Sequence, residues 1–146
     1  MALSSARKEL HAAMVRELRR MVANSVLFNT RMAETLKVNP TDLQFINLLE
    51  VHGPLTPGKL AELTRLTTGG VTVVLDRLEK AGVIRRAPNP SDRRSSIVHV
   101  SPNFLRTAQA AYSEMGRATD MLLAEFSERE LAVVLTFLKK ANDIRA

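Results

Sequence analysis

The segment from residue 67 to residue 100 constrains the fold most, because it predicts a short amphipathic helix followed directly by a β-hairpin. The helix is indicated by apolar residues at the spacing i, i+3, i+4, i+7, which gives it one buried face. These residues are Val71, Val74, Leu75 and Leu78. Thr67 or Thr68 is expected to cap its start, and Gly82 stands where a glycine often follows a helix. Residues 83–87 and 95–100 are expected to form strands on either side of turn-forming residues 88–92.

Two more helices are predicted before this segment. Thr41 and Gln44 match a capping box with Thr41 as the N-cap, and the helix that they begin is expected to end near Gly53. Thr56 and Pro57 are a second start signal, since a capping side chain precedes a proline at the first helical position. This short helix, residues 57 to about 64, is expected to bury Leu60, Ala61 and Leu63. Together with the helix from residue 67 it predicts a helix-turn-helix, to which the hairpin adds a wing.

Long helices flank this winged unit in the sequence. Apolar residues recur at helical spacing from residue 10 to residue 36, and Asn39-Pro40 is expected to end that helix. Ser101-Pro102 begins another helix, and a capping box at residues 127–130 begins the last one, which is expected to include Ile144. The predicted fold class is therefore mainly α (α+β). We expect a single domain, residues 1–146, with a winged helix-turn-helix at 41–101 and dimerisation helices at 1–39 and 102–146.

The flanking helices carry broad apolar stripes, and the small winged unit has its own core to fill. The stripes must be covered by something else, because large exposed apolar patches are rare on monomeric proteins. We expect the same helices of a second copy to cover them, which predicts a homodimer. The alternative is a monomer in which the three helices bury their stripes against one another.

The charge of the chain favours a polyanionic partner. Its 21 lysine and arginine residues exceed its 15 aspartate and glutamate residues, which gives a net charge of +6. Nucleic acid is the first partner indicated and an anionic membrane surface the second, although many small basic proteins bind neither. The absence of cysteine excludes disulfides, thiol redox sensing and cysteine-ligated zinc. Because the sequence has neither an apolar run of about 18 residues nor a recognisable signal peptide, we expect no membrane partner and a cytoplasmic location.

The solvent-facing side of the helix from residue 67 carries candidate DNA contacts. Val73 gains nothing from water there, but it could contact a thymine methyl group in the major groove, and Thr72 could do the same or form a hydrogen bond. Gly69 and Gly70 each cost a helix about 1 kcal/mol relative to alanine, so they suggest that a phosphate approaches the backbone closely. The alternative is a frayed first turn. Arg77 could contact a phosphate or pair with a nearby acid. The candidate residues on the helix are Thr67, Thr68, Gly69, Thr72, Val73 and Arg77.

The hairpin carries arginines at its base, Arg85 and Arg86, and at its tip, Arg93 and Arg94. Narrow A·T-rich minor grooves concentrate negative potential, so we expect the tip arginines to enter one. Asp92 could hold the guanidinium of Arg94 in one orientation. The alternative is that the tip arginines are only solvated charges. The predicted partner is double-stranded DNA, with the helix in a major groove and the wing in a minor groove.

Over essentially its whole length the sequence resembles the MarR family of bacterial transcription regulators. The strongest matches are LTPGKLAELTRLTTGGVTVVLDRLEKAGVIRR and NPSDRRSSIVHVS. The D-x-R pattern of the family's wing stands at residues 92–94, and its D-R-L-E-x-x-G pattern stands at residues 76–82. The resemblance implies a homodimer on a pseudo-palindromic operator. It also implies that a small ligand, often an aromatic acid or a phenol, releases the DNA from a pocket between the dimerisation helices and the winged unit.

Two departures from the family pattern affect these expectations. Val73 stands where many members have arginine, so thymine contacts could replace a guanine contact. The cysteine of peroxide-sensing relatives is absent, so thiol oxidation is not the expected switch. We expect a repressor that a small ligand releases, but the sequence does not identify the ligand-binding residues. Four side chains could line a pocket, although core packing is the simpler interpretation of each: Phe28, Phe45, Tyr112 and Met115.

No catalytic or metal-binding constellation is recognisable in the sequence. His11, His52 and His99 lie far apart and lack metal-ligand spacing. There is no glycine-rich phosphate loop and no G-x-S-x-G motif. We therefore expect neither an enzyme nor a bound cofactor or metal. Two other functions fit the charge: an architectural protein that binds DNA with low specificity, and a module whose winged helix binds an acidic protein.

Overall fold

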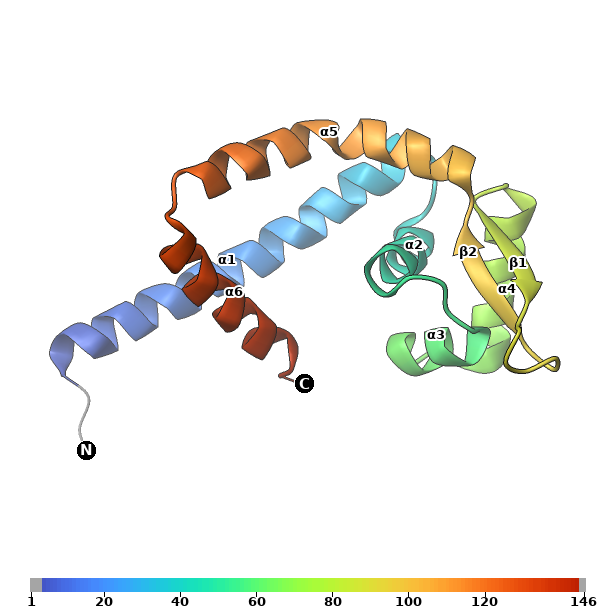
Figure 1. Cartoon of the computed structure of the whole chain (residues 1–146), viewed down its shortest axis with the longest axis horizontal. Helices are drawn as coiled ribbons and strands as arrows, with labels where there is room; N and C mark the ends of the chain where they lie inside the picture. The colour runs from blue at the N-terminus through green and yellow to red at the C-terminus, as the bar shows by residue number, and fades with distance from the viewer. Residues whose placement is uncertain (1–3, 145–146) are drawn as a thin grey trace. The chain divides into compact units, whose positions relative to one another are not determined.

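The computed structural model describes residues 4–144, which form six helices and a two-stranded sheet (Figure 1). The chain divides into two compact units, of which the first ends at Ala108 and the second begins at Gln109. The mainly helical fold class with a small sheet is confirmed. The elements are α1 (Ser5–Thr35), α2 (Pro40–His52), α3 (Pro57–Thr64), α4 (Thr68–Lys80), β1 (Ile84–Pro88), β2 (Ser96–Val100), α5 (Pro102–Ala124) and α6 (Glu128–Asn142).

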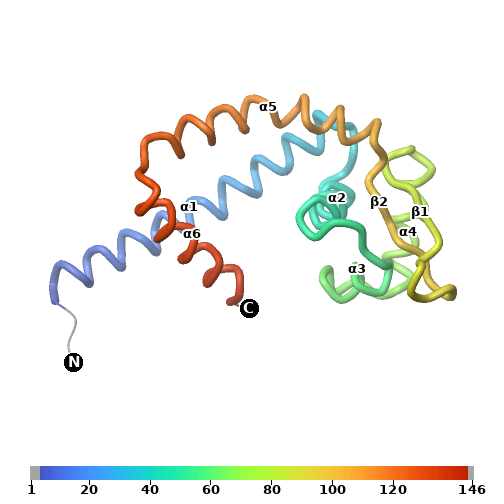
Figure 2. Tube along the Cα trace, in the orientation of Figure 1, coloured from blue at the N-terminus to red at the C-terminus, as the bar shows by residue number. Residues whose placement is uncertain are grey.

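The core of the first unit lies where α2, α3, α4 and the hairpin meet, and Figure 2 shows the hairpin beside α4. All four apolar residues predicted for the buried face of α4 are buried, which confirms the helical spacing. Leu60 is also buried as predicted, but the prediction for Leu63 is wrong, since 37% of its surface is exposed. The reason is that α3 is only eight residues long and packs against α4 and β2 with one narrow face.

The hairpin is antiparallel and joins the core through alternate residues. Ile84 pairs with Val100 and Arg86 with Val98, so that Ile84 and Val98 face inward while Arg85 faces solvent. Leu55, in the connection between α2 and α3, exchanges two backbone hydrogen bonds with Val98, with N···O distances of 3.3 and 2.8 Å. These bonds attach the base of the wing to the helix-turn-helix.

Most of the predicted helix starts are confirmed by capping hydrogen bonds. Thr56, Thr67 and Ser127 are N-caps, and Ser127 forms the predicted capping box with Glu130. Ser101 caps α5, since its hydroxyl oxygen accepts a hydrogen bond from the backbone N–H of Phe104 at 3.3 Å.

The prediction that Thr41 caps α2 is wrong. Asn39 is the N-cap, and its side-chain oxygen accepts a hydrogen bond from the backbone N–H of Asp42 at 2.8 Å. Pro40 occupies the first turn of the helix, where the missing N–H costs nothing. Asn39-Pro40 therefore begins α2, whereas α1 has already ended at Thr35.

Several helices expose large apolar residues. On α1 these are Leu10, Met14, Met21, Val22, Val26 and Leu27. The helices of the second unit expose Met115, Met121, Leu122, Leu123, Val133, Val134, Leu135 and Leu138, and outside its helices Phe126 and Ile144 are exposed as well. No residue of α6 is buried, and α6 ends at Asn142, so that Ile144 lies beyond the helix in which it was predicted. Within residues 4–144 no helix has the length and apolar character needed to cross a membrane.

Candidate nucleic-acid interface

The start of α4 is held by its cap. The hydroxyl oxygen of Thr67 accepts a hydrogen bond from the backbone N–H of Gly70 at 3.1 Å. The first turn is therefore a regular helical turn, and the alternative of a frayed turn does not describe this structure. The N-terminal end of a helix carries a partial positive charge, which favours a phosphate placed beside it.

The outer face of α4 presents the candidates that were predicted to face solvent. Thr68, Gly69, Thr72 and Val73 are exposed, opposite the buried face, and 61% of the surface of Val73 is accessible. The hydroxyl of Thr72 donates a hydrogen bond to the carbonyl oxygen of Thr68 at 2.9 Å. The hydroxyl oxygen of Thr72 can still accept a further hydrogen bond, and the methyl group of the Thr72 side chain stays available for an apolar contact.

No contact or backbone angle in the described part of the chain explains why residue 69 is a glycine. A methyl group added at its Cα would meet no atom within 4 Å, and no positive φ angle requires a glycine there. The neighbouring Gly70 differs, because a methyl group there would lie 3.3 Å from the hydroxyl oxygen of the capping Thr67. Gly70 thus accommodates the cap, whereas Gly69 leaves open space on the outer surface of the helix.

Arg77 pairs with a buried acid on α2. Its Nε donates a hydrogen bond to Oδ2 of Asp42 at 3.0 Å, and its Nη2 donates to Oδ1 of the same carboxylate. Asp42 is 4% exposed, and its hydrogen bond to Arg77 raises the pKa of the guanidinium. Of the two possibilities left open by the sequence, the structure contains the ion pair, which fixes α4 to α2.

Arg86 connects the wing to the outer face of α4, a role that the sequence reasoning missed. Its guanidinium donates hydrogen bonds to Asp76 at 2.7 Å and to Glu79 at 3.2 Å, and its backbone N–H donates to Glu79 at 3.1 Å. The sequence did contain a signal for this bridge. Two acidic residues stand three positions apart on the exposed face of the helix, and the strand that follows contains arginine. Surface ion pairs contribute only about 0–1 kcal/mol each, so the main effect of this bridge is to fix geometry.

The tip of the wing is ordered by short side chains rather than by its arginines. The carboxylate of Asp92 accepts a hydrogen bond from the backbone N–H of Arg94 at 2.9 Å. The expectation that Asp92 holds the guanidinium of Arg94 is therefore wrong, because the nearer backbone amide takes the carboxylate. The side-chain amide of Asn89 donates to the hydroxyl of Ser95 at 2.8 Å, which closes the loop from the other side.

Arg93 and Arg94 are both exposed, and no carboxylate in residues 4–144 forms an ion pair with either. Their positive charge is therefore not compensated within the described chain. Residues 4–144 contain no group of three or more histidine or acidic side chains placed to hold a metal ion. The arrangement thus combines an outward-facing helical surface with a cationic arm, a combination suited to two neighbouring grooves of duplex DNA.

Comparison with known proteins agrees with this arrangement. The MarR family model matches residues 38–96, which cover α2 to the start of β2. An uncharacterized HTH-type transcriptional regulator of Bacillus subtilis, YcgE, is 35% identical over 99% of this chain and 94% of its own length. The multiple antibiotic resistance protein MarR of Salmonella typhimurium is 27% identical over 72% of this chain and 74% of its own.

Solved structures show the same fold. Streptococcus pneumoniae FabT in complex with DNA superposes with a TM-score of 0.67 at 18% identity, over 90% of this chain and 94% of FabT. The transcriptional regulator Tm0710 from Thermotoga maritima superposes with a TM-score of 0.65 at 19% identity, over 90% of this chain and 92% of Tm0710. The full-length similarity to YcgE and the match over the winged unit establish the family. The chain therefore belongs to the MarR family and is a transcriptional regulator that binds DNA.

Proposed function

We propose that the protein binds a pseudo-palindromic operator as a homodimer, with each α4 in a major groove and each wing in a flanking minor groove. The observation that carries this proposal is the exposure of the outer face of α4 together with Arg93 and Arg94, whose charges meet no carboxylate in the described chain. Arg86 holds the wing against α4, so that α4 and the wing can contact their two grooves at the same time.

The homodimer is supported by the apolar surface of α5 and α6. Ten large apolar side chains of the second unit are exposed, and α6 contains no buried residue. Two helices of this amphipathic kind cannot cover each other completely, so a second copy is the natural source of the missing apolar surface. In a symmetric dimer, the separation of the two α4 helices sets the half-site spacing of the operator.

We assign different roles to the candidate residues. Val73 and Thr72 contact base edges, while Thr67, Thr68 and Gly69 place the helix start against the phosphate backbone. Arg93 and Arg94 enter the minor groove. Arg77 acts as a positioning residue, since its bond to Asp42 fixes how α4 projects from α2.

We further propose that the protein is a repressor and that a small ligand controls its release from DNA. The support for a ligand is a cavity beside α2 in the first unit. The family resemblance implies an aromatic acid or a phenol as this ligand, whereas the acidic Glu50 in the lining of the cavity disfavours an anion.

Footprinting on genomic fragments that the protein selects tests the proposal, together with sedimentation of the free protein. We expect protection of two related half-sites about 10 base pairs apart, centre to centre, and a dimer in solution. Protection without sequence preference would instead identify a low-specificity architectural protein. A monomer that ignores promoter fragments at low salt would contradict the proposal, and tight binding to an acidic protein would replace it.

Gly69→Ala separates a role in DNA contact from a role in folding. Alanine is the better helix former, so we expect the free energy of unfolding to rise by about 0.5–1 kcal/mol. We expect operator affinity to fall by about 10-fold, because the new methyl group blocks the approach of a phosphate to the backbone. Urea denaturation and fluorescence anisotropy with labelled operator measure the two effects.

The matched control is Gly116→Ala on α5, where an added methyl group also meets no atom within 4 Å. This variant should gain helix stability in the same way and keep its operator affinity. Equal affinities for the Gly69→Ala variant and the parent protein would remove Gly69 from the set of DNA contacts.

A further inference from the structure

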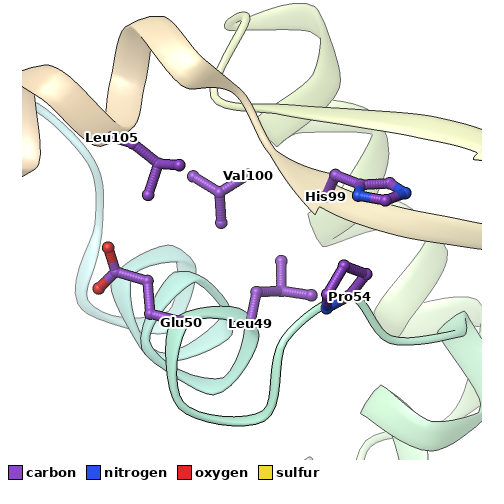
Figure 3. A pocket seen from close by; sticks show the side chains of 6 residues that line it. All are labelled: Leu49, Glu50, Pro54, His99, Val100 and Leu105. Atoms are coloured by element: carbon purple, nitrogen blue, oxygen red, sulfur yellow. The ribbon is translucent and has the colours of Figure 1, made fainter.

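A cavity of about 410 Å³ lies within the first unit, between the end of α2, the end of β2 and the start of α5 (Figure 3). Its volume falls within the range of about 300–1,000 Å³ that is usual for small-molecule sites. The lining residues are Leu49, Glu50, Pro54, His99, Val100 and Leu105.

The cavity is apolar in the middle and polar at its ends. Leu49 and Val100 point toward each other across it, while Glu50 and His99 lie at opposite ends (Figure 3). Leu49 is buried and Val100 is half-buried, so the middle of the cavity can hold a flat or branched apolar group.

The charge at one end of the cavity is negative. Glu50 is the only acidic residue that lines it, and no lysine or arginine does. Glu50 is exposed at the edge of the cavity, yet its surroundings remove enough water to raise the pKa of its carboxyl group. Within the described residues no ion pair engages it. A cation placed at this end would replace the lost solvation of the carboxylate, whereas an anion would be repelled by it.

We propose that this cavity binds a small organic cation, with its ammonium group at Glu50 and its apolar body between Leu49, Val100 and Leu105. The imidazole of His99, at the far end, offers a hydrogen bond to a polar group of the ligand. The ligand class differs from the aromatic acids that the family resemblance implies, because the chemistry of this cavity favours the opposite charge. The cavity is lined by the end of α2 and by the strand that supports the wing, so we expect the bound cation to alter operator affinity. This expected change in affinity rests on the proposed function.

Three probes of nearly equal size and different charge test the proposal: benzylamine, benzyl alcohol and benzoate. Each is titrated into the ¹⁵N-labelled full-length protein without DNA at pH 8, and the titration with benzylamine is repeated at pH 9. We expect the amide signals of Val100 and Leu105 to shift with benzylamine. We expect benzylamine to bind at least about 10-fold more tightly than benzoate, with benzyl alcohol in between.

Glu50→Gln keeps the size of the side chain and removes its charge, so the difference between the amine and the acid should disappear in this variant. The matched control is Glu34→Gln, which removes an exposed glutamate of α1 that does not line the cavity, and it should keep the preference. Circular dichroism checks that both variants fold. Tighter binding of benzoate, the same preference in the Glu50→Gln variant, or no shift at the cavity with any probe would overturn the proposal. Because the titration contains no DNA, a failure of operator binding in the footprint leaves its outcome unaffected.

Discussion

Replacing Arg93 and Arg94 together by alanine should lower operator affinity roughly 100-fold, while leaving the protein folded. Both side chains are exposed and form no ion pair with a described carboxylate, so their removal costs the free protein little. Each arginine that neutralises the charge of a DNA phosphate releases counterions from the DNA when the protein binds. The slope of log affinity against log salt concentration should therefore become shallower by about 2. Anisotropy titrations between 50 and 300 mM salt measure both quantities.

The control for this variant removes the same charge from another place. Arg19→Ala with Arg20→Ala takes two exposed arginines from α1, outside the winged unit. This pair should change the net charge equally and alter operator affinity by less than about 3-fold. If both double variants lose the same affinity, net charge alone drives binding and the wing makes no specific contact. An unchanged salt slope in the Arg93 and Arg94 variant would mean that neither arginine neutralises phosphate charge in the complex.

Phe45→Ala should lower the free energy of unfolding by about 3–5 kcal/mol, a large share of the stability of a domain of this size. Phe45 is fully buried in the core of the first unit, where helices α2, α3 and α4 meet the hairpin. Its removal leaves a cavity that the surrounding helices cannot close without shifting. Because the residues around it include the inner face of α4, operator binding should also weaken at temperatures where the variant is still folded.

Urea denaturation followed by far-ultraviolet circular dichroism measures this effect, since the chain has no tryptophan and only one tyrosine. Parent and variant must be compared at one protein concentration, because dimerisation would make stability depend on concentration. The control is Val51→Ala on the same helix, because 78% of the surface of Val51 is exposed to solvent. It should change the free energy of unfolding by no more than about 0.5 kcal/mol. A similar loss in both variants would mean that α2 is not packed as described.

Local patterns predicted much of the fold correctly. The buried face of α4 followed from apolar spacing alone, and the starts of α3, α4 and α6 followed from capping residues. Such features depend on residues within one or two turns of each other, so the sequence contains the needed information. The start of α2 was predicted two residues late, because Thr41 and Asn39 are both good caps and only the geometry at Pro40 favours Asn39.

The contacts that hold the candidate site together could not be predicted in the same way. Asp42 and Arg77 are 35 residues apart, and only the packing of α2 against α4 brings them together. Spacing within a single helix says nothing about such a pair. Asp92 shows the same limit on a smaller scale, because a carboxylate beside both a guanidinium and a backbone N–H can take either. In the wing it takes the backbone N–H.

The bridge from Arg86 to Asp76 and Glu79 has a consequence for how the operator can vary. Since β1 packs against α4 and Arg86 bridges the two elements, we expect the arm to keep its position relative to α4 rather than follow a displaced target. Inserting one base pair between the sequence under α4 and the A·T tract under the arm moves that tract by about 3.4 Å and turns it by about 35°. Natural binding sites should therefore tolerate base changes at either location more readily than any change in the length between them.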